Sequence, residues 1–305
     1  MNLRVVSLLG LGNVGQMIGQ LLLHCSPSHY IINVVDPSGE IDGTYLDLSH
    51  STALYPGKSV ELNNMDLLGE SDIIFHCAGS GVPSHGDRLS IARENTELAE
   101  TIFKPISWKS TAIVIVVSNP VDIITYTVQR ATGLPESQII GTGTFLDSIR
   151  LDASMNQNSR SNDIYKNVVI GEHGSSMVHA RSLSTINGKK LDENVDSKWI
   201  DACLDQTIHA AKTIKKTQGA TYHAVSACAI RLFQCIEKNA GEVIPVSRVL
   251  TDEHQLNLGC KPIALSLPCS IGTNGATPTS LSLTEEELVQ LKKSAHVIET
   301  VQYGE

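Results

Sequence analysis

Short apolar runs alternate with amphipathic segments through the first half of the chain. The apolar runs are rich in β-branched residues and apolar nearly throughout, which is typical of central strands in a parallel sheet covered on both faces. They are residues 4–9, 31–35, 72–78 and 112–117. Helices are predicted to begin at Asn13, near Ser90 and after Asn119-Pro120. The alternation predicts an α/β fold whose N-terminal part is a Rossmann-type, doubly wound parallel sheet.

The pattern changes from about Leu151 onward. Residues 156–163 are polar and predict a loop or a frayed helix end, and Asn187-Gly188 predicts a type I′ hairpin turn. Two amphipathic helices, two strands of a smaller antiparallel or mixed sheet, and a C-terminal helix opened by a capping box at Thr284 follow. Their ranges are 195–217 and 221–237 for the helices, 244–250 and 263–268 for the strands, and 284–302 for the last helix. We therefore expect two domains, one over residues 1–143 and a second, α+β domain over residues 144–305.

Composition narrows the functional class. A net charge of −9 argues against a nucleic-acid partner and against an anionic membrane surface. The seven cysteines include no Cys-x-x-Cys pair, so we expect free thiols and no metal site. The first apolar run is too short for a membrane span and leads into a glycine turn, so it is interpreted as a strand, and the cytoplasm is the expected location.

A glycine-rich loop at the end of the first strand is the candidate cofactor site. Gly10, Gly12 and Gly15 follow a predicted strand and open a predicted helix, and Asp36 ends the next strand, 21 residues after Gly15. This context is the one expected of a dinucleotide site, with the pyrophosphate at the helix N-terminus. Asp36 would bind the ribose hydroxyls and repel a 2′-phosphate, which favours NAD over NADP. The alternative is a glycine turn without a ligand in an ordinary α/β fold.

The candidate catalytic group is His173, which lies in the string Gly171-Glu172-His173-Gly174. Imidazole titrates near neutral pH, as a base for a hydroxyl proton must. Asp147 would orient this ring, and Arg150, one helical turn later, would hold a substrate carboxylate through its planar fork. Arg88 follows a segment containing Gly and Pro that would close over the substrate and bring this cation to the carbonyl.

These strings resemble those of the L-lactate/malate dehydrogenase family of NAD-dependent 2-hydroxy acid dehydrogenases, over nearly the whole chain. The similarity includes residues 117–122, 141–144, 219–222 and 267–269. It implies that His173 and Asp147 form the proton-relay pair, that Arg150 binds the substrate carboxylate, and that Arg88 is the mobile-loop arginine. It further implies substrate contacts from Asn119 and Thr221. The residues assigned to NAD are Gly10, Gly12, Asn13, Val14, Gly15, Asp36, Ala78, Gly79, Asn95, Val117 and Asn119.

The substrate is less clearly indicated. By a gap-free count from Arg88, the position that would contact the substrate side chain is Val82, and no register within residues 80–87 offers an arginine or lysine. A valine cannot neutralise a second carboxylate, so lactate or a larger apolar 2-hydroxy acid is expected. The loop is atypical for the bacterial L-lactate dehydrogenases that the chain otherwise resembles. Malate dehydrogenase and a catalytically silent NAD-binding relative are the alternatives. The resemblance implies a homodimer or homotetramer.

Two polar residues have plainer interpretations. His76 lies on an apolar strand and is expected to be a core histidine with its hydrogen bonds satisfied. Asp152 is expected to be solvated. It occupies the position at which sugar-phosphate-activated lactate dehydrogenases carry an arginine, so activation by a bisphosphate is not expected.

Overall fold

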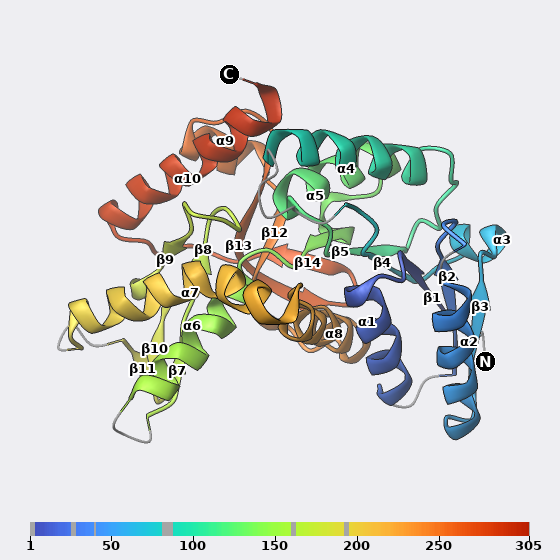
Figure 1. Ribbon diagram of the computed structural model, residues 1–305. Coiled ribbons are helices and arrows are strands. Elements are labelled where there is room, and N and C mark those ends of the chain that lie inside the picture. The colour runs from blue at the N-terminus through green and yellow to red at the C-terminus, as the bar shows by residue number, and fades with distance from the viewer. Residues whose placement is uncertain are drawn as a thin grey trace.

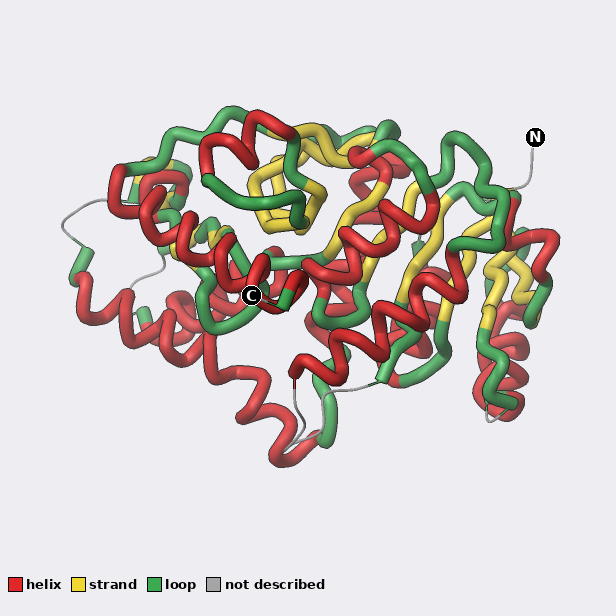
Figure 2. The backbone as a smooth tube through the Cα atoms, turned by 90° about the horizontal axis from the view of Figure 1, so that it is seen from above, coloured by secondary structure: helices red, strands yellow, loops and turns green. Residues whose placement is uncertain are grey.

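The computed structural model describes residues 4–25, 29–39, 41–80, 88–159, 163–191 and 195–304. A single large sheet runs through it, in the order β14-β13-β12-β6-β5-β4-β1-β2-β3 (Figure 1). Its strands are β1 (Arg4–Leu9), β2 (Tyr30–Val35), β3 (Lys58–Leu62), β4 (Ile73–His76), β5 (Ile113–Val116), β6 (Ile139–Gly141), β12 (Glu242–Val249), β13 (Ala264–Gly272) and β14 (Gly275–Pro278). Figure 2 shows the strands, in yellow, among the helices, in red, as seen from above.

Strands β1 to β6 are parallel and follow the order 3-2-1-4-5-6 of a doubly wound dinucleotide fold. The order reverses between β1 and β4, and a ligand is expected where it reverses, beyond the carboxyl ends of the strands. The N-terminal Rossmann architecture predicted from the sequence is therefore confirmed. The sequence pattern missed β3, which alternates between intermediate, exposed and buried positions because it lies at the edge of the sheet.

The prediction of a separate smaller sheet for residues 244–250 and 263–268 is wrong. β12 pairs antiparallel with β6 through Ser247 and Gly141, and β13 pairs antiparallel with β12 over its length. Strands β12, β13 and β14 therefore extend the N-terminal sheet, whereas two small separate sheets hold the other strands of the C-terminal half. Local sequence predicts a strand but not the edge to which it is added, because that choice depends on packing between distant segments.

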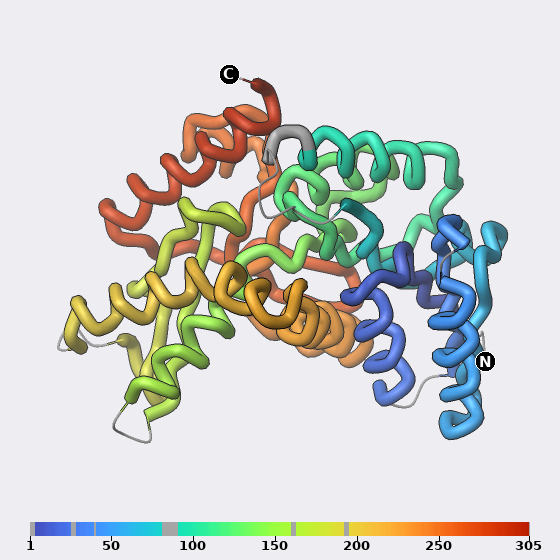
Figure 3. The backbone as a smooth tube through the Cα atoms, viewed as in Figure 1, coloured from blue at the N-terminus to red at the C-terminus, as the bar shows by residue number. Residues whose placement is uncertain are grey.

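The helices cover both faces of the sheet. They are α1 (Asn13–His24), α2 (Asp42–Ser51), α3 (Met65–Gly69), α4 (Arg88–Phe103), α5 (Val121–Thr132), α6 (Phe145–Asn158), α7 (Ser197–Gln218), α8 (His223–Lys238), α9 (Asp252–Leu258) and α10 (Glu285–Tyr303). Ile18 and Leu22 of α1 pack with Phe233 of α8 in one core, and Phe103 of α4 packs with Ile124 of α5 in a second core on the other face. Helix α8 thus lies beside α1, although about two hundred residues separate them (Figure 3).

Smaller elements complete the C-terminal half. The remaining strands are β7 (Tyr165–Lys166), β8 (Val169–Ile170), β9 (Val178–His179), β10 (Thr185–Ile186) and β11 (Lys189–Lys190). The hairpin at Asn187-Gly188 is confirmed, because both residues have positive φ and Ile186 pairs with Lys189. The capping box at Thr284 is also confirmed: its hydroxyl accepts from the Glu287 amide, and the Glu287 carboxylate accepts from the Thr284 amide.

Two expectations about single residues need correction. His76 is buried, but its ring nitrogens have no hydrogen-bond partner among the described residues, so it is not satisfied; burial lowers its pKa to about 4. Asp152 is partly buried and not solvated. Its Oδ1 accepts from the Asn167 amide at 2.6 Å and from Asn167 Nδ2 at 2.8 Å, while burial raises the pKa of Asp152 to about 6.

The cysteines agree with the expectation of free thiols. All seven cysteines are free, and five of them are buried. None of the helices in the described residues is long and apolar enough to span a membrane.

Candidate active site

The glycine loop between β1 and α1 is shaped by close backbone approach. Gly10 has φ +87°, and a Cβ there would lie 2.7 Å from the Ala78 backbone at the end of β4. A Cβ on Gly15 would collide with the carbonyl oxygen of Gly10. Among the described residues, nothing lies within 4 Å of a Cβ built on Gly12, which opens α1, and no side chain caps that helix N-terminus. The loop therefore leaves uncapped backbone N–H groups facing open space, as a pyrophosphate requires.

Asp36 lies beside this loop at the end of β2. Its Oδ2 accepts from the Leu11 amide at 2.9 Å and its Oδ1 accepts from the Ser38 amide at 3.1 Å. Burial alone would raise the pKa of Asp36, but these N–H donors outweigh burial and lower it. Asp36 is thus an ionised carboxylate at the edge of the dinucleotide site, a charge that suits ribose hydroxyls and disfavours a phosphate. These residues fit NAD.

Asn95 on α4 joins the loops that follow β4 and β5. Its Oδ1 accepts from the Ser80 amide at 2.8 Å, and its Nδ2 donates to the carbonyl oxygen of Asn119 at 2.6 Å. The side chain is 2% exposed, so these contacts occupy its polar atoms. Asn95 therefore holds Asn119 and the loop after Gly79 in place, and its predicted contact with NAD stays a prediction.

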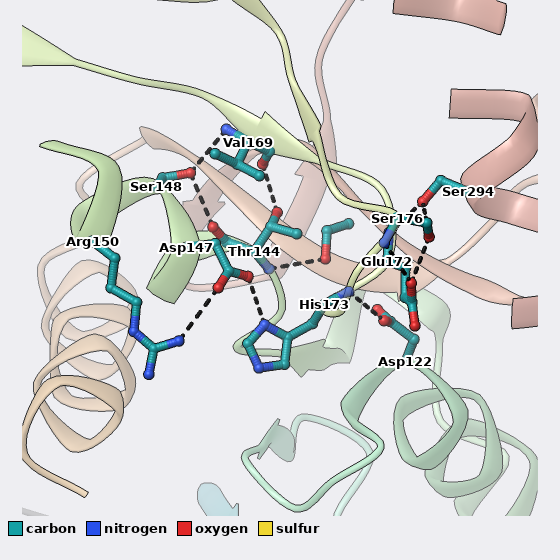
Figure 4. A network of polar contacts seen from close by, with 11 residues as sticks. Asp122, Thr144, Asp147, Ser148, Arg150, Val169, Glu172, His173, Ser176 and Ser294 are labelled. Atoms are coloured by element: carbon teal, nitrogen blue, oxygen red, sulfur yellow. Dashed lines mark hydrogen bonds and ion pairs between the residues drawn. The ribbon is translucent and has the colours of Figure 1, made fainter. Parts of the chain in front are cut away.

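The predicted base and its orienting carboxylate are in direct contact. His173 Nδ1 donates to Asp147 Oδ2 at 2.6 Å, and the other ring nitrogen points away from Asp147 (Figure 4). Asp147 is 1% exposed. Burial would lower the pKa of His173, but the Asp147 charge and hydrogen bond outweigh burial, so the pKa is raised. The ring is therefore held as a proton donor to Asp147, which stabilises its charged form.

The helix that carries Asp147 and the strand that leads to His173 are tied together. Thr144, the residue before α6, donates through Oγ1 to the Val169 carbonyl at 2.6 Å. Ser148 Oγ accepts from the Val169 amide at 3.0 Å (Figure 4). Since β8 leads within three residues to His173, these bonds fix the separation between the carboxylate and the ring.

Two more carboxylates, Asp122 and Glu172, hold the His173 turn. Asp122 Oδ2 on α5 accepts from the His173 amide at 2.9 Å, and burial raises the pKa of Asp122 to about 6. Glu172 accepts from the Ser176 amide at 3.1 Å, and its own amide donates to Ser294 Oγ of α10 at 2.8 Å. Neither residue was assigned a role from the sequence, although Asp122 lies in one of the segments that carry the family resemblance. No local pattern shows that α5 meets the turn that carries His173.

Arg150 lies one turn after Asp147 on α6. Its Nη1 is 3.5 Å from Asp147 Oδ1, and its buried Nε has no hydrogen-bond partner among the described residues. A buried guanidinium N–H without a partner is costly, and a ligand carboxylate would satisfy it. The guanidinium therefore suits the carboxylate-binding role predicted for it.

One cavity of about 360 Å³ brings these groups together. Its described lining includes Val14, Val117, Asn119, Arg150, His173 and Thr221, all predicted from the sequence. It also includes residues that the sequence analysis did not single out, namely Ile91, Ile123, Lys215, Val225, Val297, Ile298 and Val301. Arg88 begins α4, but its side chain, like the whole of Val82, lies outside the described residues.

Comparison with known proteins identifies the family. Residues 4–141 match the model of the lactate/malate dehydrogenase NAD binding domain, and residues 144–301 match that of the lactate/malate dehydrogenase alpha/beta C-terminal domain. The chain belongs to the lactate/malate dehydrogenase family. It is thus an NAD-dependent oxidoreductase acting on a CH–OH group, and its substrate is a small hydroxy or keto acid.

Individual members of the lactate/malate dehydrogenase family resemble the chain over its full length. An L-lactate dehydrogenase of Thermoanaerobacter sp. (strain X514) is 31% identical, with 97% of each chain covered. The minor L-lactate dehydrogenase from Enterococcus mundtii superposes with a TM-score of 0.88 at 26% identity, covering 100% of this chain and 99% of that one. The malate dehydrogenase from Archaeoglobus fulgidus in complex with NADH superposes with a TM-score of 0.84 at 29% identity, with 99% of both chains covered.

Proposed function

We propose that this protein catalyses reversible hydride transfer between NADH and a 2-keto acid, with His173 as the acid–base group. The observation that carries the proposal is the pairing of His173 Nδ1 with the buried Asp147 carboxylate at 2.6 Å, in a cavity that Arg150 also lines. Bound NADH supplies the hydride, which the carbonyl carbon of the keto acid accepts.

The residues move the proton and hold the substrate. The carboxylate of the keto acid lies on the Arg150 guanidinium, which places the carbonyl oxygen at His173 Nε2. Reduction leaves negative charge on that oxygen, and the protonated His173 donates its Nε2 proton there, yielding the hydroxyl group. Asp147 stabilises the imidazolium before transfer, and the neutral ring takes the proton back in the reverse direction. Arg88 polarises the carbonyl, and Asn119 contacts the substrate near the nicotinamide.

The favoured substrate is pyruvate or a larger apolar 2-keto acid. Val82 and Thr221 support this choice, as does an apolar cavity wall formed by Ile91, Ile123 and residues of α10. An apolar wall gains from covering an alkyl side chain, whereas a second carboxylate against it would be costly. The L-lactate dehydrogenase relatives point the same way.

Three further properties complete the proposal. The dinucleotide domain spans residues 1–143 and the substrate domain residues 144–305, a division that agrees with the end of one family match and the start of the next. The protein acts in the cytoplasm. It assembles as a homodimer or homotetramer.

The deciding experiment follows NADH oxidation with pyruvate, 2-oxobutyrate, 2-oxoisocaproate, phenylpyruvate and oxaloacetate in turn. We expect the highest kcat/KM with a monocarboxylate. His173→Ala should cost about 10²–10⁴ in kcat while NADH binding persists. Equal loss of NADH binding would make His173 a structural residue, and absence of turnover with every keto acid would leave an NAD-binding protein without this activity.

A further inference from the structure

The substrate cavity has two unlike sides. One side is apolar and is built from α4, α5 and α10, which contribute Ile91, Ile123, Val297, Ile298 and Val301. The other side is formed by α7, the turn after it and α8, which contribute Ala211, Lys215, Thr221 and Val225. Figure 1 shows α10 and α4 above the centre of the molecule and α7 and α8 below it. Helix α7 thus brings a lysine to a site where the sequence predicts an apolar environment.

Among the residues that the structure describes, Lys215 is the cation of the cavity lining that has no ion-pair partner. Arg150 and Lys215 are the two permanent cations in its described lining, and Arg150 lies beside Asp147. The lining carboxylates of Asp122 and Glu172 already accept from backbone amides of the His173 turn. Within the described parts of the chain, the Lys215 ammonium makes no ion pair or hydrogen bond.

The position of Lys215 has an ordinary structural explanation, which a neighbouring residue helps to test. A lysine in the last turn of a helix stabilises the negative end of the helix dipole. Lys216 lies in the same turn of α7, is exposed as Lys215 is, and does not line the cavity. The dipole therefore accounts equally for both residues, but it does not explain why Lys215 also lines the cavity.

We propose that Lys215 determines substrate specificity by binding the distal carboxylate of a dicarboxylic 2-keto acid whose first carboxylate lies on Arg150. This inference rests on the proposed function and deepens it: the enzyme accepts such dicarboxylates besides monocarboxylates. Residues 80–87 contain no arginine or lysine that could pair with a second carboxylate. Lys215 supplies the positive charge that this loop lacks. The long, flexible stem of lysine suits a point charge that reaches toward substrates of different length.

The test compares substrates within each variant. We would measure kcat/KM for oxaloacetate and 2-oxoglutarate relative to pyruvate in the wild type, Lys215→Met, Lys215→Glu and the matched control Lys216→Met. Lys215→Met should lower the ratio for the better dicarboxylate about tenfold, mainly through KM, which corresponds to about 1.4 kcal/mol. Lys215→Glu should lower the ratio further, and Lys216→Met should leave it unchanged.

Salt provides a second readout that a merely structural role would not change. Because Lys215 is exposed, its attraction for a carboxylate should weaken as the screening length falls from ~30 Å at ~0.01 M salt to ~10 Å at ~0.1 M. The dicarboxylate-to-pyruvate ratio should therefore fall with added KCl in the wild type and in Lys216→Met, and change less in Lys215→Met.

The outcomes separate the inference from the function on which it rests. A wild type that reduces pyruvate but neither dicarboxylate overturns the role of Lys215 and leaves the proposed function intact. An unchanged ratio in Lys215→Met, or an equal fall in Lys216→Met, does the same. Absence of turnover with these three keto acids and also with 2-oxobutyrate, 2-oxoisocaproate and phenylpyruvate overturns both.

Discussion

Asp122 and His173 are joined by a hydrogen bond between a carboxylate on α5 and a backbone amide in the turn after β8, at 2.9 Å (Figure 4). Helix α5 belongs to the dinucleotide-binding part of the chain, whereas His173 belongs to the C-terminal half. The bond therefore fixes the turn that carries His173 relative to helix α5. The negative charge of Asp122 also contributes to the raised pKa of His173.

Replacing Asp122 by Asn separates these two effects. The amide oxygen can still accept from the His173 N–H, but the charge is removed, so the pKa of His173 should fall. Keto-acid reduction needs protonated His173, so its kcat/KM should begin to decline at a lower pH than in the wild type. Full pH profiles measure this shift. Asp152→Asn, which removes a partly buried carboxylate elsewhere, is the control, and equal profiles for Asp122→Asn and wild type would contradict the prediction.

Asp147→Asn tests the orienting role in the proton relay. The Asn amide group can present its oxygen to Nδ1–H but carries no charge to stabilise the imidazolium. We expect kcat for reduction to fall by about 10²–10⁴, with NADH affinity little changed. Since the Asp147 charge raises the pKa of His173, the remaining reduction activity should be confined to lower pH. Single-turnover rates across pH give both quantities, and an unshifted profile would show that Asp147 does not act through this pKa.

Arg150→Lys keeps the positive charge but removes the planar fork. Two N–H groups can no longer meet one carboxylate side by side, so KM for pyruvate should rise about 10–100-fold. The Kd of NADH, measured by fluorescence, should stay within a few-fold of the wild type. If the Kd of NADH rose while the KM for pyruvate stayed unchanged, Arg150 would belong to the cofactor site instead of the substrate site.

Asp36→Ala addresses cofactor choice. Loss of an ionised acceptor at the ribose position should weaken NADH binding by about tenfold and narrow the preference for NADH over NADPH. Titration of both cofactors measures the ratio of their Kd values. Asp66→Ala removes an exposed carboxylate on α3 and should not change that ratio. An unaltered ratio in Asp36→Ala would exclude Asp36 as the group that selects NAD.

His76→Leu should stabilise the fold, and more so in acid. The pKa of His76 is lowered to about 4 in the folded protein. As pH falls from 6.5 toward 4, the unfolded chain therefore binds a proton at His76 that the folded chain does not, which favours unfolding. Removing this buried, unpaired ring should raise the free energy of unfolding by about 1–3 kcal/mol. Denaturant unfolding at pH 7 and pH 5 measures the change. His50→Gln removes an exposed histidine instead, and a gain that shrinks on acidification would contradict the argument.

The candidate site shows which of its features the sequence could predict. The Gly10 to Gly15 loop, its helix and Asp36 were predictable because turn, helix start and strand end lie within one short supersecondary unit. The contact between His173 and Asp147 was expected from the resemblance. The length of this contact depends on bonds that Thr144 and Ser148 make to Val169, and no local pattern indicates that role. The free nitrogens of His76 were unpredictable for a related reason: hydrogen-bond satisfaction depends on neighbours from other segments.

The sequence by itself thus determined the alternation of strands and helices, the dinucleotide loop and the residue types of the reaction, since these depend on side-chain period and local turn chemistry. Only the tertiary structure decided that β12 to β14 extend the main sheet and that Asp122 of α5 holds His173. It also decided that α7 and α10 bring Lys215 and Val297 to the substrate cavity. Those relationships arise from packing between segments far apart in the chain, which no local pattern encodes.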